Sequence, residues 1–108
     1  MSFLDRVTNM LTRGGRDENL LREGLEHAKG KRPDKALEIY TKLVDDKATS
    51  ASVRARALFN RALAYSSMDD DDRARADLEK VLTLPGLPEN VQTAARNQLA
   101  RVKRRSEA

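Results

Sequence analysis

Two stretches of this chain repeat one pattern of small and large residues at an offset of 38 positions. When Leu20 is aligned with Leu58, small residues meet small ones, as at Gly24 and Ala62. The other aligned pairs are His27 with Tyr65, Ala36 with Ala74, Tyr40 with Leu78, Leu43 with Val81 and Val44 with Leu82. Each stretch holds two apolar runs with helical spacing and a polar turn between them. The repeat therefore predicts two helical hairpins packed on one another, and it constrains the fold more than any single residue does.

Capping and breaking residues predict the helix boundaries. An apolar stripe over residues 2–12 predicts a short amphipathic helix that Gly14-Gly15 ends. Asp17 is expected to cap the next helix, which runs to about Lys29, and Pro33 is expected to open the one after it. The remaining expected boundaries are a helix from Ser50 or Ser52, a helix capped within Asp69–Asp72 and ending at Pro85-Gly86, and a last helix opened by Pro88.

The composition agrees with helices packed through small residues. Aromatic residues make up 4% of the 108-residue chain and charged residues 35%, so Leu, Ala and Val supply the apolar content. The predicted fold is all-α: two hairpins, a C-terminal capping helix and a short N-terminal helix. The expected division is an N-terminal amphipathic helix with its Gly-Gly break over 1–16, a helical domain over 17–105 and a frayed tail over 106–108.

The repeated pattern resembles the tetratricopeptide repeat. That repeat places a small residue four after a large apolar one, an aromatic three later, and an Ala after nine more. The second copy matches with Leu58, Ala62, Tyr65 and Ala74, and AARNQLARV in the last helix overlays ALFNRALAY as a weaker half copy. Two features depart from the pattern: the period is 38 instead of about 34, and a usually apolar position holds Glu23 in one copy and Arg61 in the other.

The resemblance implies a concave groove lined by the first helix of each hairpin and by the last helix. An apolar floor with basic and amide edges suits a peptide with acidic and apolar residues. Its candidate residues are Leu21, Arg22, Leu25 and Lys29 from the first copy, Arg56, Phe59, Asn60 and Leu63 from the second, and Arg96, Asn97 and Ala100 from the last helix.

Two further readings bear on this groove. In chaperone-binding members of the family, a carboxylate clamp uses a Lys and an Asn on the first helix. Leu21 and Leu25 stand at those positions here, which disfavours a ligand of that sort. Alternatively, the chain itself covers the groove with the apolar residues of its N-terminal helix, which are Phe3, Leu4, Val7 and Leu11.

The residues favour binding over catalysis. The chain has no cysteine and a single histidine, His27, which stands where the second copy has Tyr65 and is interpreted as a packing residue. The acidic run Asp69–Asp72 lacks the spacing of a calcium loop and reads as a turn and helix cap. We therefore expect no enzyme activity, cofactor or metal. No apolar run is long enough to span a membrane, and a cytoplasmic location is expected.

The predicted function is that of a small adaptor or scaffold that binds a protein or peptide partner, whose identity the sequence does not specify. One alternative is binding of nucleic acid or another anionic surface. The cations for that contact are Arg101, Lys103, Arg104 and Arg105, and no aromatic residue is interleaved with them for base stacking. Another alternative is self-association, because the ends of a short solenoid expose apolar surface.

Overall fold

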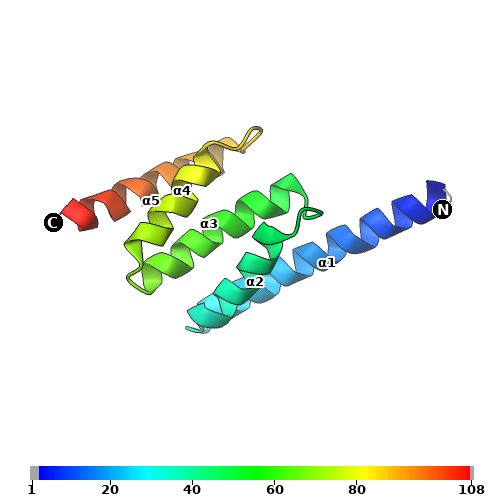
Figure 1. The fold of residues 1–108 in the computed structure, drawn as a ribbon, viewed down its shortest axis with the longest axis horizontal. Coiled ribbons are helices and arrows are strands. Elements are labelled where there is room, and N and C mark those ends of the chain that lie inside the picture. The colour runs from blue at the N-terminus through cyan, green and yellow to red at the C-terminus, as the bar shows by residue number, and fades with distance from the viewer. Residues whose placement is uncertain (1–2, 108) are drawn as a thin grey trace.

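The computed structural model describes residues 3–107, and for residues 5–14 it describes the backbone alone. Within that range it contains helices and no strand (Figure 1). The helices are α1 (Phe3–Lys29), α2 (Pro33–Asp45), α3 (Ala51–Ser67), α4 (Asp71–Leu82) and α5 (Glu89–Glu107). The predicted all-α class is confirmed. None of the described helices is both long enough and apolar enough to cross a membrane.

Each helix packs against the next one along the chain. The helices α1 and α2 form one hairpin, α3 and α4 form the second, and α5 covers the end of the stack against α4. In Figure 1, α1, α3 and α5 run in the same direction, and α2 and α4 return between them. The result is an elongated body with extents of 58 × 29 × 20 Å. This is the predicted architecture of two hairpins and a capping helix.

The two hairpin turns repeat each other in their backbone hydrogen bonds. In the first turn the amide of Arg32 donates to the carbonyl of His27 at 2.8 Å. At the same offset of 38 residues, the amide of Asp70 donates to the carbonyl of Tyr65 at 2.9 Å. The residue before each donor has a φ of 60°: these residues are Lys31 and Asp69. The offset found in the sequence is thus present in the backbone geometry of both turns.

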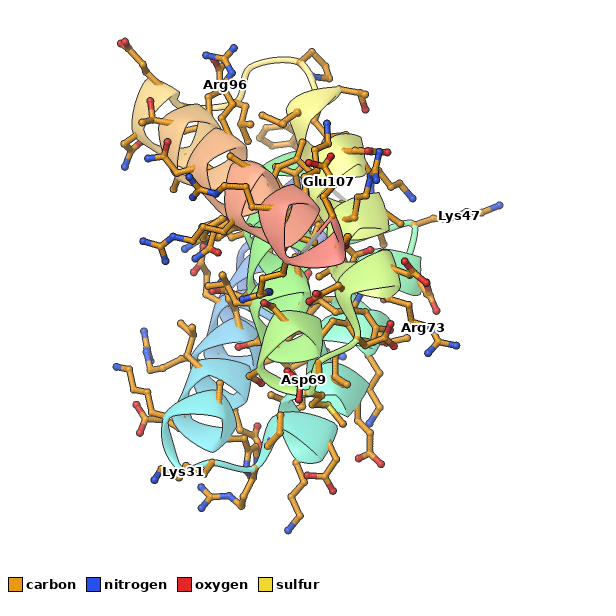
Figure 2. All side chains as sticks on the ribbon, turned by 90° about the vertical axis from the view of Figure 1, so that its left-hand side faces the viewer. Lys31, Lys47, Asp69, Arg73, Arg96 and Glu107 are labelled. Atoms are coloured by element: carbon orange, nitrogen blue, oxygen red, sulfur yellow. The ribbon has the colours of Figure 1, made fainter. Side chains whose placement is uncertain are left out.

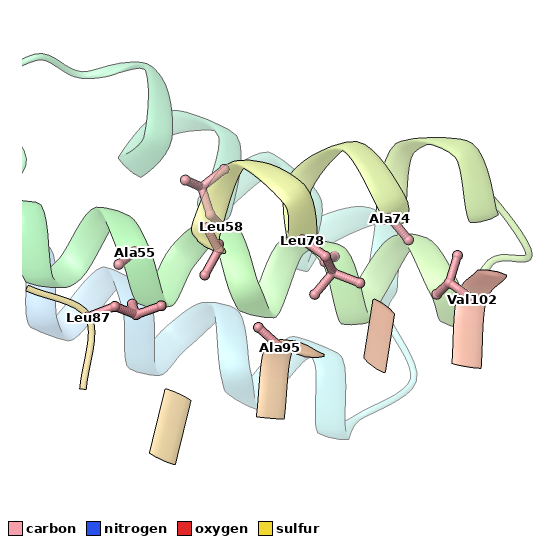
Figure 3. Packing of buried hydrophobic residues seen from close by; sticks show 9 residues of the cluster. Ala55, Leu58, Ala74, Leu78, Leu87, Ala95 and Val102 are labelled. Carbon is pink, nitrogen blue, oxygen red and sulfur yellow. The ribbon is translucent and has the colours of Figure 1, made fainter. Parts of the chain in front are cut away.

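Two buried clusters form the core. One lies between α1, α2 and α3, and the other lies between α3, α4 and α5 (Figure 3). Ala36, Ala62 and Ala74 are almost completely buried, which shows that the small residues of the repeat lie at the helix contacts. Large side chains complete the core; those with no more than 2% exposure are Tyr40, Leu43, Leu58, Leu78, Val81 and Val102.

The first hairpin uses a different pair of residues at one of these contacts. A Cβ atom added to Gly24 would lie 2.6 Å from Cε1 of Tyr40, so the tyrosine ring packs directly on the glycine backbone. The second hairpin has Ala62 and Leu78 at the corresponding positions. Removing one methyl group on α1 therefore makes room for the larger ring on α2.

The predicted break at Gly14-Gly15 is wrong, because α1 continues through it as one helix. A glycine costs only about 1 kcal/mol relative to alanine inside a helix, and the residues on both sides favour the helix. Asp17 is consequently not a cap; it lies within α1, and it is 6% exposed. The boundary expected between 1–16 and 17–105 is therefore not a helix break.

α5 extends to Glu107, so the last helix continues into the residues where fraying was expected. Arg105 ties this end to the second hairpin by donating to Oδ1 of Asp71 at 3.0 Å and to Oγ of Ser66. Basic residues in the last turn also interact favourably with the helix dipole.

The N-terminal residues do not cover the groove in the way that one sequence hypothesis suggested. Phe3 and Leu4 are 78% and 73% exposed. Because α1 is continuous, its first turns extend away from the body, as Figure 1 shows, and do not fold back across it. The side chains of Val7 and Leu11 lie outside the described residues.

Candidate functional site

A hollow of about 510 Å³ lies between α1 and α3, next to the first hairpin turn. We call it the groove pocket. It is lined by Leu25, Ala28, Lys29, Lys31, Pro33, Tyr40, Asn60, Leu63, Ala64 and Ser67. Four of the residues predicted to face the groove meet here: Leu25 and Lys29 from α1, and Asn60 and Leu63 from α3.

The apolar part of the groove pocket is separate from the core. Leu25 and Leu63 are half-buried, and neither packs against the two buried clusters. Their side chains line the pocket instead. An apolar surface that the protein does not use for its own packing is available to a ligand.

Asn60 and Ser67 supply polar groups, each of which donates one hydrogen bond to a carbonyl of its own helix. The Nδ2 of Asn60 donates to the carbonyl of Arg56 at 2.9 Å, one helical turn earlier. The hydroxyl of Ser67 donates to the carbonyl of Ala64 at 2.7 Å. The carbonyl oxygen of the Asn60 side chain accepts no bond from the described residues and can accept one from a ligand.

Lysine side chains provide the charge at the groove pocket. Lys29 ends α1 and Lys31 lies in the turn, and both are exposed. Neither forms an ion pair with any described residue, and no acidic residue lines the pocket. Figure 2 looks at the end of the molecule where the hairpin turns lie, with Lys31 in one turn and Asp69 in the neighbouring one.

Tyr40 reaches the groove pocket from α2. The residue is fully buried, yet its hydroxyl has no hydrogen-bond partner among the described residues. Burial raises the pKa of this hydroxyl to about 12, so it stays protonated at neutral pH and remains a potential donor.

Several predicted groove residues lie elsewhere. Leu21 is 3% exposed and belongs to the cluster between α1, α2 and α3, so its assignment to the groove is wrong. It lies one turn before Leu25, on the part of α1 that packs on the neighbouring helices. Phe59 is partly buried against the cluster that α5 closes.

The remaining residues predicted to face the groove are outside the groove pocket. Arg56 pairs with Glu18, which joins α3 to α1, and Arg22 donates to Oδ1 of Asn19 at 3.2 Å. Arg96 and Asn97 are exposed on α5. Ala100 is exposed on α5 as well. A role for these residues in contacting a ligand in the groove stays a prediction.

The sequence reasoning missed Tyr40 and Lys31 as residues of this site. The repeat aligns Tyr40 with the apolar residue Leu78, although a hydroxyl at a core position is itself a signal. Lys31 lies between the expected helix end at about Lys29 and the expected helix start at Pro33, and its positive φ becomes visible only in the backbone. Pro33 was recognised as a helix start, and its place at the pocket depends on how the hairpins pack.

The other sequence features have structural roles. Asp70 is the N-cap of α4 and accepts from the amide of Arg73 at 3.3 Å, which confirms the acidic run as a turn and cap. The hydrogen bond from the Arg73 side chain lowers the pKa of Asp70. The Nδ1 of His27 accepts from Nε of Arg32 at 3.0 Å. Within the described residues there is no group of three or more His, Cys, Asp or Glu that could hold a metal.

The basic residues of α5 are only partly free. Arg105 is engaged by Asp71, as described above, and Lys103 is half-buried. Arg101 and Arg104 are exposed. Contact of this surface with an anionic partner stays a prediction.

Residues 55–85 match the family model of the tetratricopeptide repeat. The match covers α3 from Ala55 onwards, α4 and the start of the loop that follows. The chain is a tetratricopeptide-repeat-like protein. Its first hairpin, which lies outside the match, is related to the second by the 38-residue offset and by the hydrogen bonds of the turn. Comparisons with curated proteins and with solved structures gave no match. The family indicates a protein interaction module.

Proposed function

We propose that this tetratricopeptide-like protein is a non-catalytic adaptor that binds a peptide segment of a partner protein on the face formed by α1 and α3. The observation that supports this most directly is the groove pocket, where Leu25 and Leu63 line a hollow without joining the core. Stacked helical repeats present extended concave surfaces for such binding. We also propose that the protein acts in the cytoplasm.

The chemistry of the groove pocket suits a peptide with at least one apolar anchor. Burying a Leu-sized side chain is worth about 1.5–3 kcal/mol, which is enough to make one or two such contacts decisive. The free carbonyl oxygen of Asn60 can accept a hydrogen bond from the backbone of the same peptide. Apolar anchoring next to a few fixed polar groups is the usual composition of a small binding pocket.

A peptide array tests this proposal with a matched pair of variants. Leu63→Glu places a charge in the groove pocket, whereas Leu37→Glu makes the same change outside it, at a half-buried residue of α2 that packs against the core. Both variants are first checked for folding by circular dichroism. We expect the peptides that bind the wild type to bind Leu37→Glu equally well and to show no binding to Leu63→Glu. Equal binding of both variants would show that the groove pocket is not the binding site.

A further inference from the structure

We expect Tyr40 to make the free protein less stable than a phenylalanine would. Its hydroxyl is buried with no partner among the described residues, and an unsatisfied buried polar group costs free energy. The ring itself is well packed on Gly24, so the fold has a use for the aromatic ring. The hydroxyl oxygen, by contrast, makes no hydrogen bond with the described residues.

Lys31 carries a similar cost in its backbone. Its φ of 60° lies in the left-handed region, where glycine fits without strain and asparagine or aspartate is tolerated. The second hairpin has Asp69 at the corresponding turn, a residue type that is enriched in this conformation. A lysine at this position gives up stability and places a cation at the edge of the groove pocket.

The two residues that lower stability, Tyr40 and Lys31, lie at the same groove pocket. Tyr40 comes from α2 and Lys31 from the turn before it, and both line the groove pocket together with Lys29. Each cost is removable by a single substitution, Tyr to Phe or Lys to Gly. Groups that lower the stability of a fold and gather at one pocket are characteristic of a functional site.

We propose that the groove pocket binds a carboxylate presented by an apolar peptide segment. The hydroxyl of Tyr40 donates a hydrogen bond to one carboxylate oxygen, and Lys29 and Lys31 provide the balancing charge. Leu25 and Leu63 contact the neighbouring apolar residues of the peptide. The hydroxyl is closed to solvent in the free protein, so the side chains that line the groove pocket must shift when the ligand enters.

This inference rests on the proposed function and specifies its ligand. It differs from the carboxylate clamp of chaperone-binding relatives, whose Lys and Asn positions hold Leu21 and Leu25 in this chain. The donor proposed here lies on α2 and the cations lie at the end of α1 and in the turn. Lys29 and Lys31 are free of ion pairs with described residues, so the site has unbalanced positive charge for an anion.

The test uses three sets of synthetic peptides on the full chain. In the first set, acetylated and amidated Leu-rich decapeptides carry one central Glu. In the second set, Gln replaces that Glu, and in the third set the only carboxylate is a free C-terminus. We expect the first or third set to bind at least about tenfold more tightly than the second, as loss of one charge-assisted hydrogen bond implies. Which of the two binds identifies the source of the carboxylate.

Variants separate a binding role from a structural one. Tyr40→Phe and Lys31→Gly are expected to keep or raise the melting temperature and to weaken binding of the carboxylate peptide by about tenfold. Asp69→Gly is the matched control: it places glycine at the corresponding position of the other turn, outside the groove pocket, so it should not lower the melting temperature and should leave affinity unchanged.

The outcomes separate this inference from the proposed function. If Leu-rich peptides bind but Glu and Gln peptides bind equally well, the groove is a binding site and the carboxylate inference is wrong. If Tyr40→Phe lowers the melting temperature, the hydroxyl has a structural partner and the inference is again wrong. If none of the three sets binds the wild type, both the inference and the proposed function fail.

Discussion

Arg61 on α3 and Asp77 on α4 form a two-pronged ion pair inside the second hairpin. The Nε and Nη2 atoms of Arg61 donate to Oδ2 and Oδ1 of Asp77, each at 2.8 Å. The side chains are 15% and 8% exposed. Arg61 also donates to Oγ1 of Thr41 on α2 at 3.3 Å and lies 5.8 Å from the ring centroid of Tyr65. This explains why a charged residue stands where the repeat pattern has an apolar one.

Removing Asp77 should therefore destabilise the whole stack. Asp77→Ala leaves a largely buried guanidinium without its partner, and we expect the free energy of unfolding to fall by about 2–4 kcal/mol, measured by urea denaturation. The double variant Arg61→Met/Asp77→Leu should recover most of this loss, since an apolar pair can replace a buried ion pair. A double variant that is no more stable than Asp77→Ala would contradict this account.

Gly24 is predicted to resist substitution. Gly24→Ala places a methyl group against the buried ring of Tyr40, and the overpacking of about 1–3 kcal/mol outweighs the gain of about 1 kcal/mol in helix propensity. Thermal unfolding should show a lower melting temperature. Adding Tyr40→Leu reproduces the Ala62 and Leu78 pair of the second hairpin and should restore stability; no recovery would show that the ring is not the obstacle.

Tyr40 also predicts how stability responds to alkaline pH. The pKa of its hydroxyl is about 12 in the folded protein and about 10 when unfolded, so the unfolded chain releases this proton first. Stability should thus be unaffected by this group below pH 10 and fall by up to about 2–3 kcal/mol between pH 10 and 12. Other groups titrate there as well, so the measured quantity is the difference in slope between wild type and Tyr40→Phe. Parallel slopes would rule out a raised pKa.

Gly15 is expected to accept a larger residue with a gain in stability. A Cβ atom added there meets nothing within 4 Å, and the residue lies inside α1. Gly15→Ala should stabilise the helix by about 0.5–1 kcal/mol and increase the helical signal in circular dichroism. A loss of helical signal would indicate that the continuous α1 does not persist in solution.

Local patterns in the sequence predicted most of the helices and their packing faces. The positions of Ala36, Ala62 and Ala74 identified the close helix contacts, and Asp70 falls in the predicted turn and cap. These features depend on spacing within a helix or on one turn, which the sequence encodes directly. The predicted break at Gly14-Gly15 is wrong because a cost of about 1 kcal/mol per glycine is a weak signal against the rest of a long helix.

The candidate site was predicted only in part. Leu25, Lys29, Asn60 and Leu63 were assigned to the groove and do line one pocket, whereas Leu21 is a core residue. One helical turn separates Leu21 from Leu25, and the spacing within α1 does not show which of them faces a neighbouring helix. That choice depends on the rotation of α1 against α2 and α3.

The 38-residue repeat on its own established that the chain folds as stacked helical hairpins, since small and large residues recur where two helices must approach closely. Contacts between helices decided the surroundings of individual polar side chains. Packing of Tyr40 on Gly24 left its hydroxyl without a partner among the described residues, in the pocket that Lys31 also lines. Packing of α3 between α2 and α4 enclosed Arg61 between Thr41 and Asp77. Such pairs lie many residues apart, and only the folded chain brings their atoms within bonding distance.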